Sequence, residues 1–170
     1  MHVIDLNAAE VEPEPSFNAD NDVIFLLFTR RNRNAGQRIT FDMNTVRNSN
    51  WVAANGARFI IHGWNSNQNT GLNTFIRNSF LDRADHNVVV VDWGAGAQNP
   101  NYLTARNHVG AVGATVARMI NALRNASPAL TAPGRVIIVG HSLGSHVAGH
   151  AGKLVSGPQV SAIFGTDPAG

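Results

Sequence analysis

The segment from Arg135 to Gly152 constrains the fold more than any other part of the chain. It begins with the apolar, β-branched run Val136–Val139, which predicts a buried parallel strand. The motif Gly-x-Ser-x-Gly follows at once around Ser142, and small and apolar residues then recur at helical spacing as far as Leu154. A strand, this motif and a helix in that order predict a sharp turn that holds the Ser142 hydroxyl above the edge of a sheet.

The predicted turn gives Ser142 the features of a catalytic nucleophile. Its flanking glycines, Gly140 and Gly144, leave room for a strained backbone. The amide of Leu143 falls in the first helical turn, where N–H groups are unpaired and the helix dipole is positive, so it can bind a developing oxyanion. A bare motif can arise by chance in a chain with 16 glycines. The strand before it and the small-residue helix after it favour the catalytic interpretation.

Strand and helix patterns alternate over the rest of the chain. Apolar runs predict strands at 23–29, 38–42, 57–61, 87–93, 136–139 and 160–164, and helical periodicity predicts helices at 72–81, 102–124 and 143–155. The run 38–42 alternates apolar and polar residues, so it is expected near one edge of the sheet. The alternation of strands and helices predicts an α/β fold with a mostly parallel central sheet and helices on both faces.

In parallel sheets, functional residues gather beyond the C-terminal ends of the strands. Four motifs end predicted strands: His62-Gly63-Trp64, Asp92-Trp93, Ser142 and Asp167. Asp167 is therefore placed as the carboxylate that orients a catalytic base, with a plain turn aspartate as the alternative. The Trp64 amide is placed as a second oxyanion donor, because Gly63 lets the backbone come close. The alternative for Trp64 is a tight turn around a packed indole.

A general base for the serine is not evident in the residues given. In this fold the triad runs serine, acid, histidine, and no histidine follows Asp167 in the 170 residues. His62 and His141 lie beside the expected site, but each has a local role in its own turn. A metal site formed by His146 and His150, one helical turn apart, has no evident third ligand and is not expected.

Composition narrows the function classes further. Because the chain has no cysteine, disulfides, thiolate metal sites and cysteine nucleophiles are excluded. A formal net charge of +2 without a long basic run argues against a nucleic-acid partner. No apolar stretch is long enough to predict a transmembrane helix. Residues 1–17, with three glutamates and two prolines, lack the pattern of a signal peptide and predict a flexible acidic segment ahead of one domain at 18–170.

Several of these segments together resemble the pancreatic lipase family of α/β-hydrolases, especially its insect neutral lipase and phospholipase A1-like branch. The matching segments, in order, are 58–65, 87–94, 140–149 and 165–169. Asn101-Tyr102 and Ala105-Arg106-Asn107 also fit. The resemblance runs from about Val23 to the last residue given. Gly-Thr-Asp at 165–167 departs from the usual Gly-Leu-Asp.

The resemblance implies an α/β-hydrolase fold in which Ser142 is the nucleophile, Asp167 the triad acid, and the Trp64 and Leu143 amides the oxyanion hole. It implies a secreted enzyme that hydrolyses carboxylic esters of triacylglycerols or phospholipids through an acyl-enzyme at a lipid–water interface. Neither a cofactor nor a metal site is expected from the residues given. Family members continue with the triad histidine, a lid and further strands. The chain is therefore expected to be the N-terminal part of the catalytic domain, without the C-terminal strands and poorly active as given. The alternative is a non-catalytic lipase-like protein that binds or stores lipid, as yolk proteins do.

Overall fold

A single sheet of six strands organises the computed structural model, which describes residues 16–170. The strands are β1 (Ile24–Phe28), β2 (Gln37–Ile39), β3 (Gly56–Ile61), β4 (His86–Asp92), β5 (Val136–His141) and β6 (Ala162–Thr166). Their order across the sheet is β2-β1-β4-β3-β5-β6. β1 runs antiparallel to both of its neighbours, whereas the pairings of β3 with β4, β3 with β5 and β5 with β6 are parallel. The predicted α/β fold with a mostly parallel sheet is confirmed.

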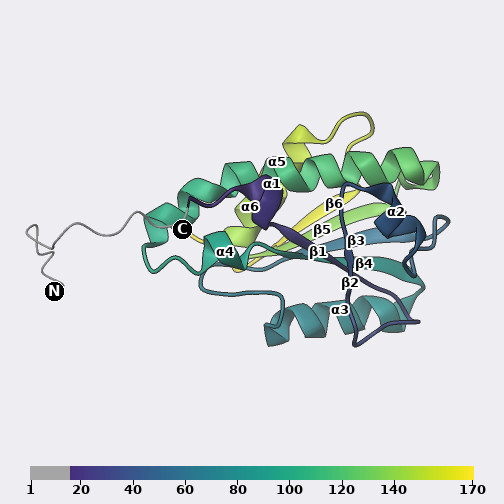
Figure 1. Cartoon of the computed structure of the whole chain (residues 1–170), viewed down its shortest axis with the longest axis horizontal. Helices are drawn as coiled ribbons and strands as arrows, with labels where there is room; N and C mark the ends of the chain where they lie inside the picture. The colour runs from purple at the N-terminus through teal and green to yellow at the C-terminus, as the bar shows by residue number, and fades with distance from the viewer. Residues whose placement is uncertain (1–15) are drawn as a thin grey trace, which may run out of the picture.

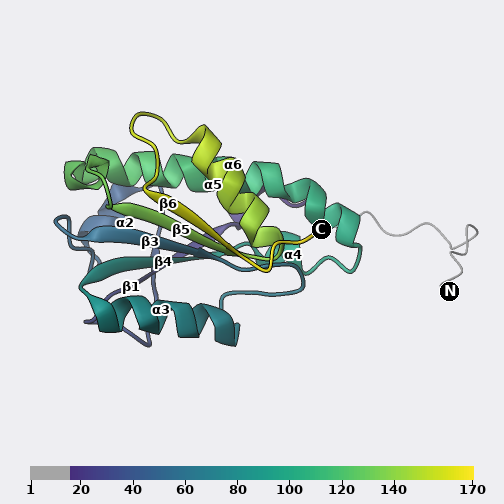
Figure 2. The same cartoon turned by 180° about the vertical axis from the view of Figure 1, so that it is seen from behind.

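Helices cover both faces of the sheet, as predicted. The longer helices are α3 (Gly71–Arg83), α5 (Tyr102–Ala126) and α6 (Leu143–Leu154). The shorter ones are α1 (Ala19–Asp22), α2 (Met43–Arg47), α4 (Gly94–Ala97) and the 3₁₀ helix η1 (Pro128–Thr131). α5, α6 and α1 lie on one face and α3 lies on the other (Figures 1 and 2). Within residues 16–170, no helix is both long enough and apolar enough to cross a membrane.

The continuous valine run of β4 is explained by these two helical layers. Side chains alternate between the faces of a strand. Val89 and Val91 therefore join the larger core cluster, to which α5 and α6 contribute, and Val88 and Val90 join a smaller cluster that contains Leu81 of α3. A strand with both faces covered needs no polar positions, and all six residues of β3 are buried for the same reason. β2 lies at the edge of the sheet, as expected, but it covers Gln37–Ile39 rather than 38–42, and Phe41 beyond it is 41% exposed.

Phe17, near the start of the described residues, packs against the rest of the structure. Residues 1–15 of the predicted acidic segment 1–17 lie outside the described residues. Phe17 is partly buried against the larger core cluster, and its ring centroid lies 4.5 Å from that of His108. A Cβ on Gly96 would come within 2.9 Å of the Phe17 ring, so the two residues are in close contact.

The sheet register determines where the functional motifs lie. Ile61 of β3 pairs with Val91 of β4 and with Gly140 of β5, and His141 pairs with Thr166 of β6. One of the four motifs lies at the end of each of these strands, and the C-terminal ends of parallel strands lie at the same edge of a sheet. The residues that follow β3, β4, β5 and β6 therefore meet at one edge of the sheet.

The outer strand β6 generates the first prediction. Within the described part of the chain it pairs only with β5, and its residues Ile163 and Phe164 are 40% and 53% exposed. An exposed apolar edge strand is a template for pairing with another chain. We therefore expect the 170-residue chain to self-associate in a concentration series by sedimentation velocity, and the double change Ile163→Lys, Phe164→Glu to reduce the association.

Phe75 offers a matched control because it is 70% exposed but lies on α3 rather than on a sheet edge. Phe75→Glu should leave the association unchanged. A wild-type chain that stays monomeric at the highest concentration would contradict the prediction.

Candidate active site

Ser142 occupies a strained turn between β5 and α6. Its backbone has φ 52° and ψ −124°, a conformation that non-glycine residues rarely adopt. A Cβ on Gly140 would lie 2.2 Å from the Gly144 carbonyl oxygen, and one on Gly144 would lie 2.3 Å from the Ile61 carbonyl oxygen. The flanking glycines are therefore required by close backbone contact. The turn of the Gly-x-Ser-x-Gly motif has the strand–turn–helix geometry that the sequence predicts.

Leu143 begins α6 directly after the serine. Its side chain is 1% exposed and anchors the start of the helix in the larger core cluster. The first N–H groups of a helix have no intrahelical acceptor, and the helix dipole is positive there. The Leu143 amide is thus an available donor immediately next to the Ser142 hydroxyl in the chain.

The turn His62–Trp64 packs directly against the serine. A Cβ on Gly63 would lie 2.7 Å from Ser142 Cβ and 3.2 Å from Ser142 Oγ. Only glycine fits at this position, and the Trp64 amide is the next N–H along the chain. The Trp64 indole is 38% exposed; its Nε1–H donates to the Asn99 carbonyl at 2.8 Å, and its ring meets Tyr102 edge-on at 5.4 Å. The structure therefore packs Gly63 against Ser142, and Trp64 follows Gly63 in the chain.

Asp167 lies at the end of the neighbouring strand. His141 and Thr166 are register partners, so Ser142 and Asp167 are the next residues on two adjacent strand ends. The Ser142 N–H donates to the Thr166 carbonyl at 3.1 Å, which ties the two ends together. Asp167 is exposed and has φ 47°. Within residues 16–170 its carboxylate makes no hydrogen bond or ion pair, so it is available to orient a base.

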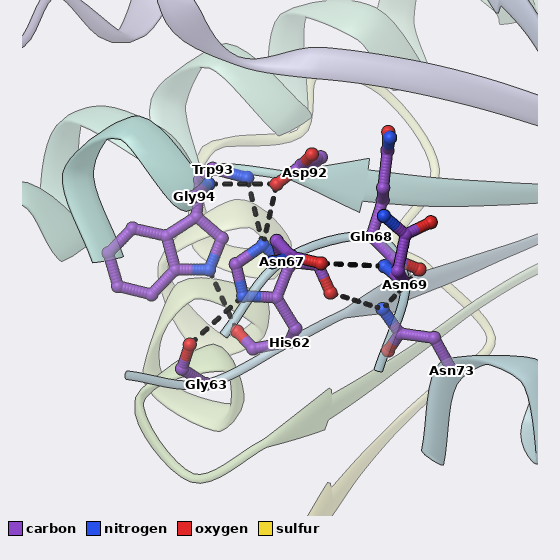
Figure 3. Close-up of polar contacts among 9 residues, drawn as sticks. All are labelled: His62, Gly63, Asn67, Gln68, Asn69, Asn73, Asp92, Trp93 and Gly94. Atoms are coloured by element: carbon purple, nitrogen blue, oxygen red, sulfur yellow. Dashed lines mark hydrogen bonds and ion pairs between the residues drawn. The ribbon is translucent and has the colours of Figure 1, made fainter. Parts of the chain in front are cut away.

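His62 is not available as a substitute base for Ser142. It is 1% exposed, its Nδ1–H donates to the Gly63 carbonyl at 2.9 Å, and its Nε2 lies 3.0 Å from Asp92 Oδ1 (Figure 3). Both ring nitrogens are thus engaged away from the serine. His146 Nε2–H donates to the Ala169 carbonyl at 2.7 Å. Among residues 16–170, no group of three or more His, Cys, Asp or Glu side chains is arranged to hold a metal ion.

A buried network around Asp92 was not predicted from the sequence. Its side chain is 13% exposed, and Oδ1 accepts a hydrogen bond from the Gly94 N–H at 2.8 Å. The Trp93 N–H points at His62 Nε2 from 3.1 Å, and the Trp93 indole N–H donates to the His62 carbonyl at 2.8 Å (Figure 3). With the Nδ1 proton donated to the Gly63 carbonyl, a second proton on Nε2 makes the ring an imidazolium that donates to Asp92, whereas a ring without that proton accepts from the Trp93 N–H instead.

The environment of Asp92 shifts its pKa downward. Burial raises the pKa of the carboxyl, but hydrogen bonds from His62 and from the Gly94 and Gln68 backbone outweigh burial and hold the pKa below its ordinary value. In the sequence, the only feature that singled out Asp92 was its position at the end of a predicted strand. The partner, His62, ends the adjacent strand β3.

A pocket of about 270 Å³ adjoins the start of α6. Its lining includes Leu143, Tyr102, Arg106, His146 and His150. Together, the site contains a hydroxyl on a strained turn, the backbone of Gly63 packed against it, and the first turn of α6 directly after it. At the adjacent strand end it has an exposed carboxylate without a partner within residues 16–170, and a pocket adjoins the start of α6. This arrangement suits nucleophilic attack on a carbonyl with stabilisation of the resulting oxyanion.

Comparison with known proteins gives a consistent result. A family model described as Lipase matches residues 4–170. The chain is similar to pancreatic triacylglycerol lipase of Sus scrofa, with 36% identity over 151 residues that make up 88% of this chain and 32% of that protein. It is also similar to pancreatic lipase-related protein 2 of Cavia porcellus, with 41% identity over 149 residues, or 85% of this chain and 33% of that protein. The chain therefore spans about a third of the length of these curated relatives.

The close contact at Gly144 can be tested by Gly144→Ala. A methyl group at 2.3 Å from the Ile61 carbonyl oxygen must push α6 away from β3. We expect the free energy of unfolding to fall by about 1–3 kcal/mol in urea denaturation. Gly149→Ala is the matched control, because Gly149 lies in the same helix and a methyl group there would have no neighbour within 4 Å. That change should raise stability by about 0.5–1 kcal/mol.

The lowered pKa of Asp92 predicts a pH-dependent contribution to stability. A carboxyl with a lowered pKa in the folded state stabilises the fold above its unfolded pKa, here about 3.8, and the stabilisation is lost as the pH falls through the folded pKa. We expect Asp92→Asn to reduce the free energy of unfolding by about 1–3 kcal/mol at neutral pH. The difference from wild type should shrink below pH 3.8.

Denaturation of both proteins over a pH series measures this difference. Asp85→Asn is the control, because Asp85 is 63% exposed and pairs with Arg30 at the surface, where an ion pair contributes little. A constant difference between wild type and Asp92→Asn at all pH values would show that the charge of Asp92 does not stabilise the fold.

Proposed function

The chain belongs to the pancreatic lipase family, and from that premise we propose that it supplies the nucleophile and the oxyanion hole of a serine hydrolase that cleaves carboxylic esters of lipids. The observation that carries the proposal is the strained backbone of Ser142, with Gly63 packed against its side chain. Such strain costs of order 1–3 kcal/mol and persists where the surrounding structure imposes it, which is common at catalytic residues.

In the proposed reaction, Ser142 Oγ attacks the carbonyl carbon of the ester while a base removes the hydroxyl proton. The carbonyl oxygen becomes an oxyanion, which the amides of Trp64 and Leu143 stabilise by hydrogen bonds. Collapse of the intermediate breaks the bond to the alcohol, which leaves with the proton from the base, and an acyl ester remains on Ser142. Water then attacks the ester and releases the fatty acid. Asp167 orients the base, which in this fold is a histidine that follows the acid in sequence.

The proposed substrates are lipid esters, either triacylglycerols or the acyl esters of phospholipids. Support comes from the names of the relatives and from apolar groups near the site. Trp64 is 38% exposed, and its ring contacts Tyr102, which lines the pocket together with Leu143. Leu103, which follows Tyr102 in the chain, is 60% exposed. Such groups suit contact with a lipid–water interface. From family membership alone we propose an extracellular location.

Chemical rescue tests the proposed function directly. Since no histidine follows Asp167 in the 170 residues, we expect little or no hydrolysis of a medium-chain p-nitrophenyl ester by this chain, because loss of a triad member costs several orders of magnitude. Added imidazole can act as the missing base. It should produce an acyl adduct on Ser142, detected by peptide mass spectrometry, and hydrolysis above the rate of imidazole alone.

Ser142→Ala gives the background, because it keeps the fold and removes the nucleophile, whereas Ser79→Ala, on α3, should behave like wild type. Equal rates for wild type and Ser142→Ala at every imidazole concentration, with no acyl adduct, would overturn the proposal. Lipid binding without any reaction at Ser142 would instead favour a lipid-binding or storage protein. Brisk turnover without imidazole would contradict the interpretation that a base is missing.

A further inference from the structure

The peptide group between Gly63 and Trp64 carries the amide assigned to the oxyanion hole. A trans peptide group is planar, so its C=O and N–H bonds point in opposite directions. Any contact that fixes the Gly63 oxygen therefore also fixes the direction of the Trp64 N–H. The His62 ring provides such a contact, because its Nδ1–H donates to the Gly63 oxygen at 2.9 Å.

This peptide needs a restraint because of the residue that precedes it. Gly63 has no side chain, since a Cβ would lie 2.7 Å from Ser142 Cβ and 2.9 Å from the His141 carbonyl oxygen. The same lack of a Cβ gives glycine access to conformations closed to other residues. The glycine that allows the close approach to Ser142 therefore also lets the Gly63–Trp64 peptide group rotate more easily. After such a rotation, the Gly63 oxygen rather than the Trp64 N–H would point toward an oxyanion.

The His62 ring is held firmly enough to serve as the restraint. Asp92 Oδ1 lies 3.0 Å from Nε2, the ring stacks on the Trp93 indole with 5.7 Å between centroids and 10° between planes, and the His62 side chain is fully buried. Asp92 is fixed in turn by the Gly94 N–H at 2.8 Å. Figure 3 shows the resulting chain of contacts from Gly94 through Asp92 and His62 to Gly63.

We propose that Asp92 and His62 are positioning residues of the oxyanion hole: Asp92 holds the His62 ring, and the ring aims the Trp64 amide through the Gly63 oxygen. Neither side chain contacts the substrate. The inference rests on the proposed function, because only a reaction that develops negative charge near Ser142 needs the amide. The orientation of the amide can nevertheless be measured without any reaction.

Two substitutions separate the two ends of the ring. In His62→Gln, the side-chain amide reaches the position of Nε2 and can still contact Asp92, but the donor to the Gly63 oxygen is lost. In His62→Asn, the amide lies near the position of Nδ1 and can donate to the Gly63 oxygen. Residual dipolar couplings of the Trp64 N–H, referenced to the amides of β3, report the direction of this bond in the folded chain. We expect a changed coupling in His62→Gln and in Asp92→Asn, and a coupling closer to wild type in His62→Asn.

His108→Gln is the matched control, because His108 Nδ1 also lies 3.2 Å from a glycine carbonyl, that of Gly96. It should leave the Trp64 coupling unchanged. In imidazole-supported hydrolysis, His62→Gln should lower kcat by up to about 100-fold, as expected for a lost oxyanion donor, and leave KM unchanged.

The outcomes distinguish this inference from the proposed function. An unchanged Trp64 coupling in folded His62→Gln and Asp92→Asn overturns the inference, whatever the activity. Equal loss of kcat in His62→Gln and His108→Gln also overturns it. A changed coupling together with no Ser142-dependent reaction in wild type would retain the restraint on the amide and reject the proposed function.

Discussion

Close contact between bare backbones at the strand ends is the constraint on which the site depends. The end of β3, the end of β5 and the start of α6 meet around Ser142, and Gly63, Gly140 and Gly144 stand where any Cβ would collide with a neighbouring backbone or with the serine. This proximity brings the backbone of Gly63 and the start of α6 to the Ser142 side chain. It also explains the positive φ of Ser142, because the chain must reverse from strand to helix within one residue. The close approach of these backbones therefore requires residues without a side chain at positions 63, 140 and 144.

The strain at Ser142 is offset by the burial of the elements on both sides of it. β5 is flanked by β3 and β6, and Val147, Ala148 and Ala151 of α6 are fully buried in the cluster shared with α5. Moving α6 to relax the turn would expose this apolar surface, at about 25 cal/mol for each Å². A local cost of order 1–3 kcal/mol is therefore smaller than the cost of relieving it. The rigidity of the sheet and of α6 keeps the serine in place.

The sequence predicted the elements that have a long periodic pattern and missed those without one. The strands β3, β4 and β5 and the helices α3, α5 and α6 were found within a few residues, because their apolar patterns span several turns or a whole strand. α1, α4 and η1 are only four residues each, too short for periodicity to indicate them. The contact of His62 with Asp92 could not be read from the sequence either, since it depends on the register that pairs Ile61 with Val91. The roles of Ser142, Asp167, Trp64 and Leu143 remain proposals that the geometry supports.

Two aspartates at this edge of the sheet illustrate what sequence alone cannot separate. Asp92 and Asp167 each lie where a parallel strand ends, and either would suit an acid that orients a catalytic histidine. Asp92 is mostly buried and accepts hydrogen bonds from its neighbours, so its Oδ1 is already used within the fold. Asp167 is exposed and has no hydrogen bond or ion pair within residues 16–170. A carboxylate with its hydrogen bonds satisfied can fix a structure, whereas one with free lone pairs can bind and orient another group. Burial and hydrogen bonding, rather than position at a strand end, thus distinguish the two aspartates and support the different roles proposed for them.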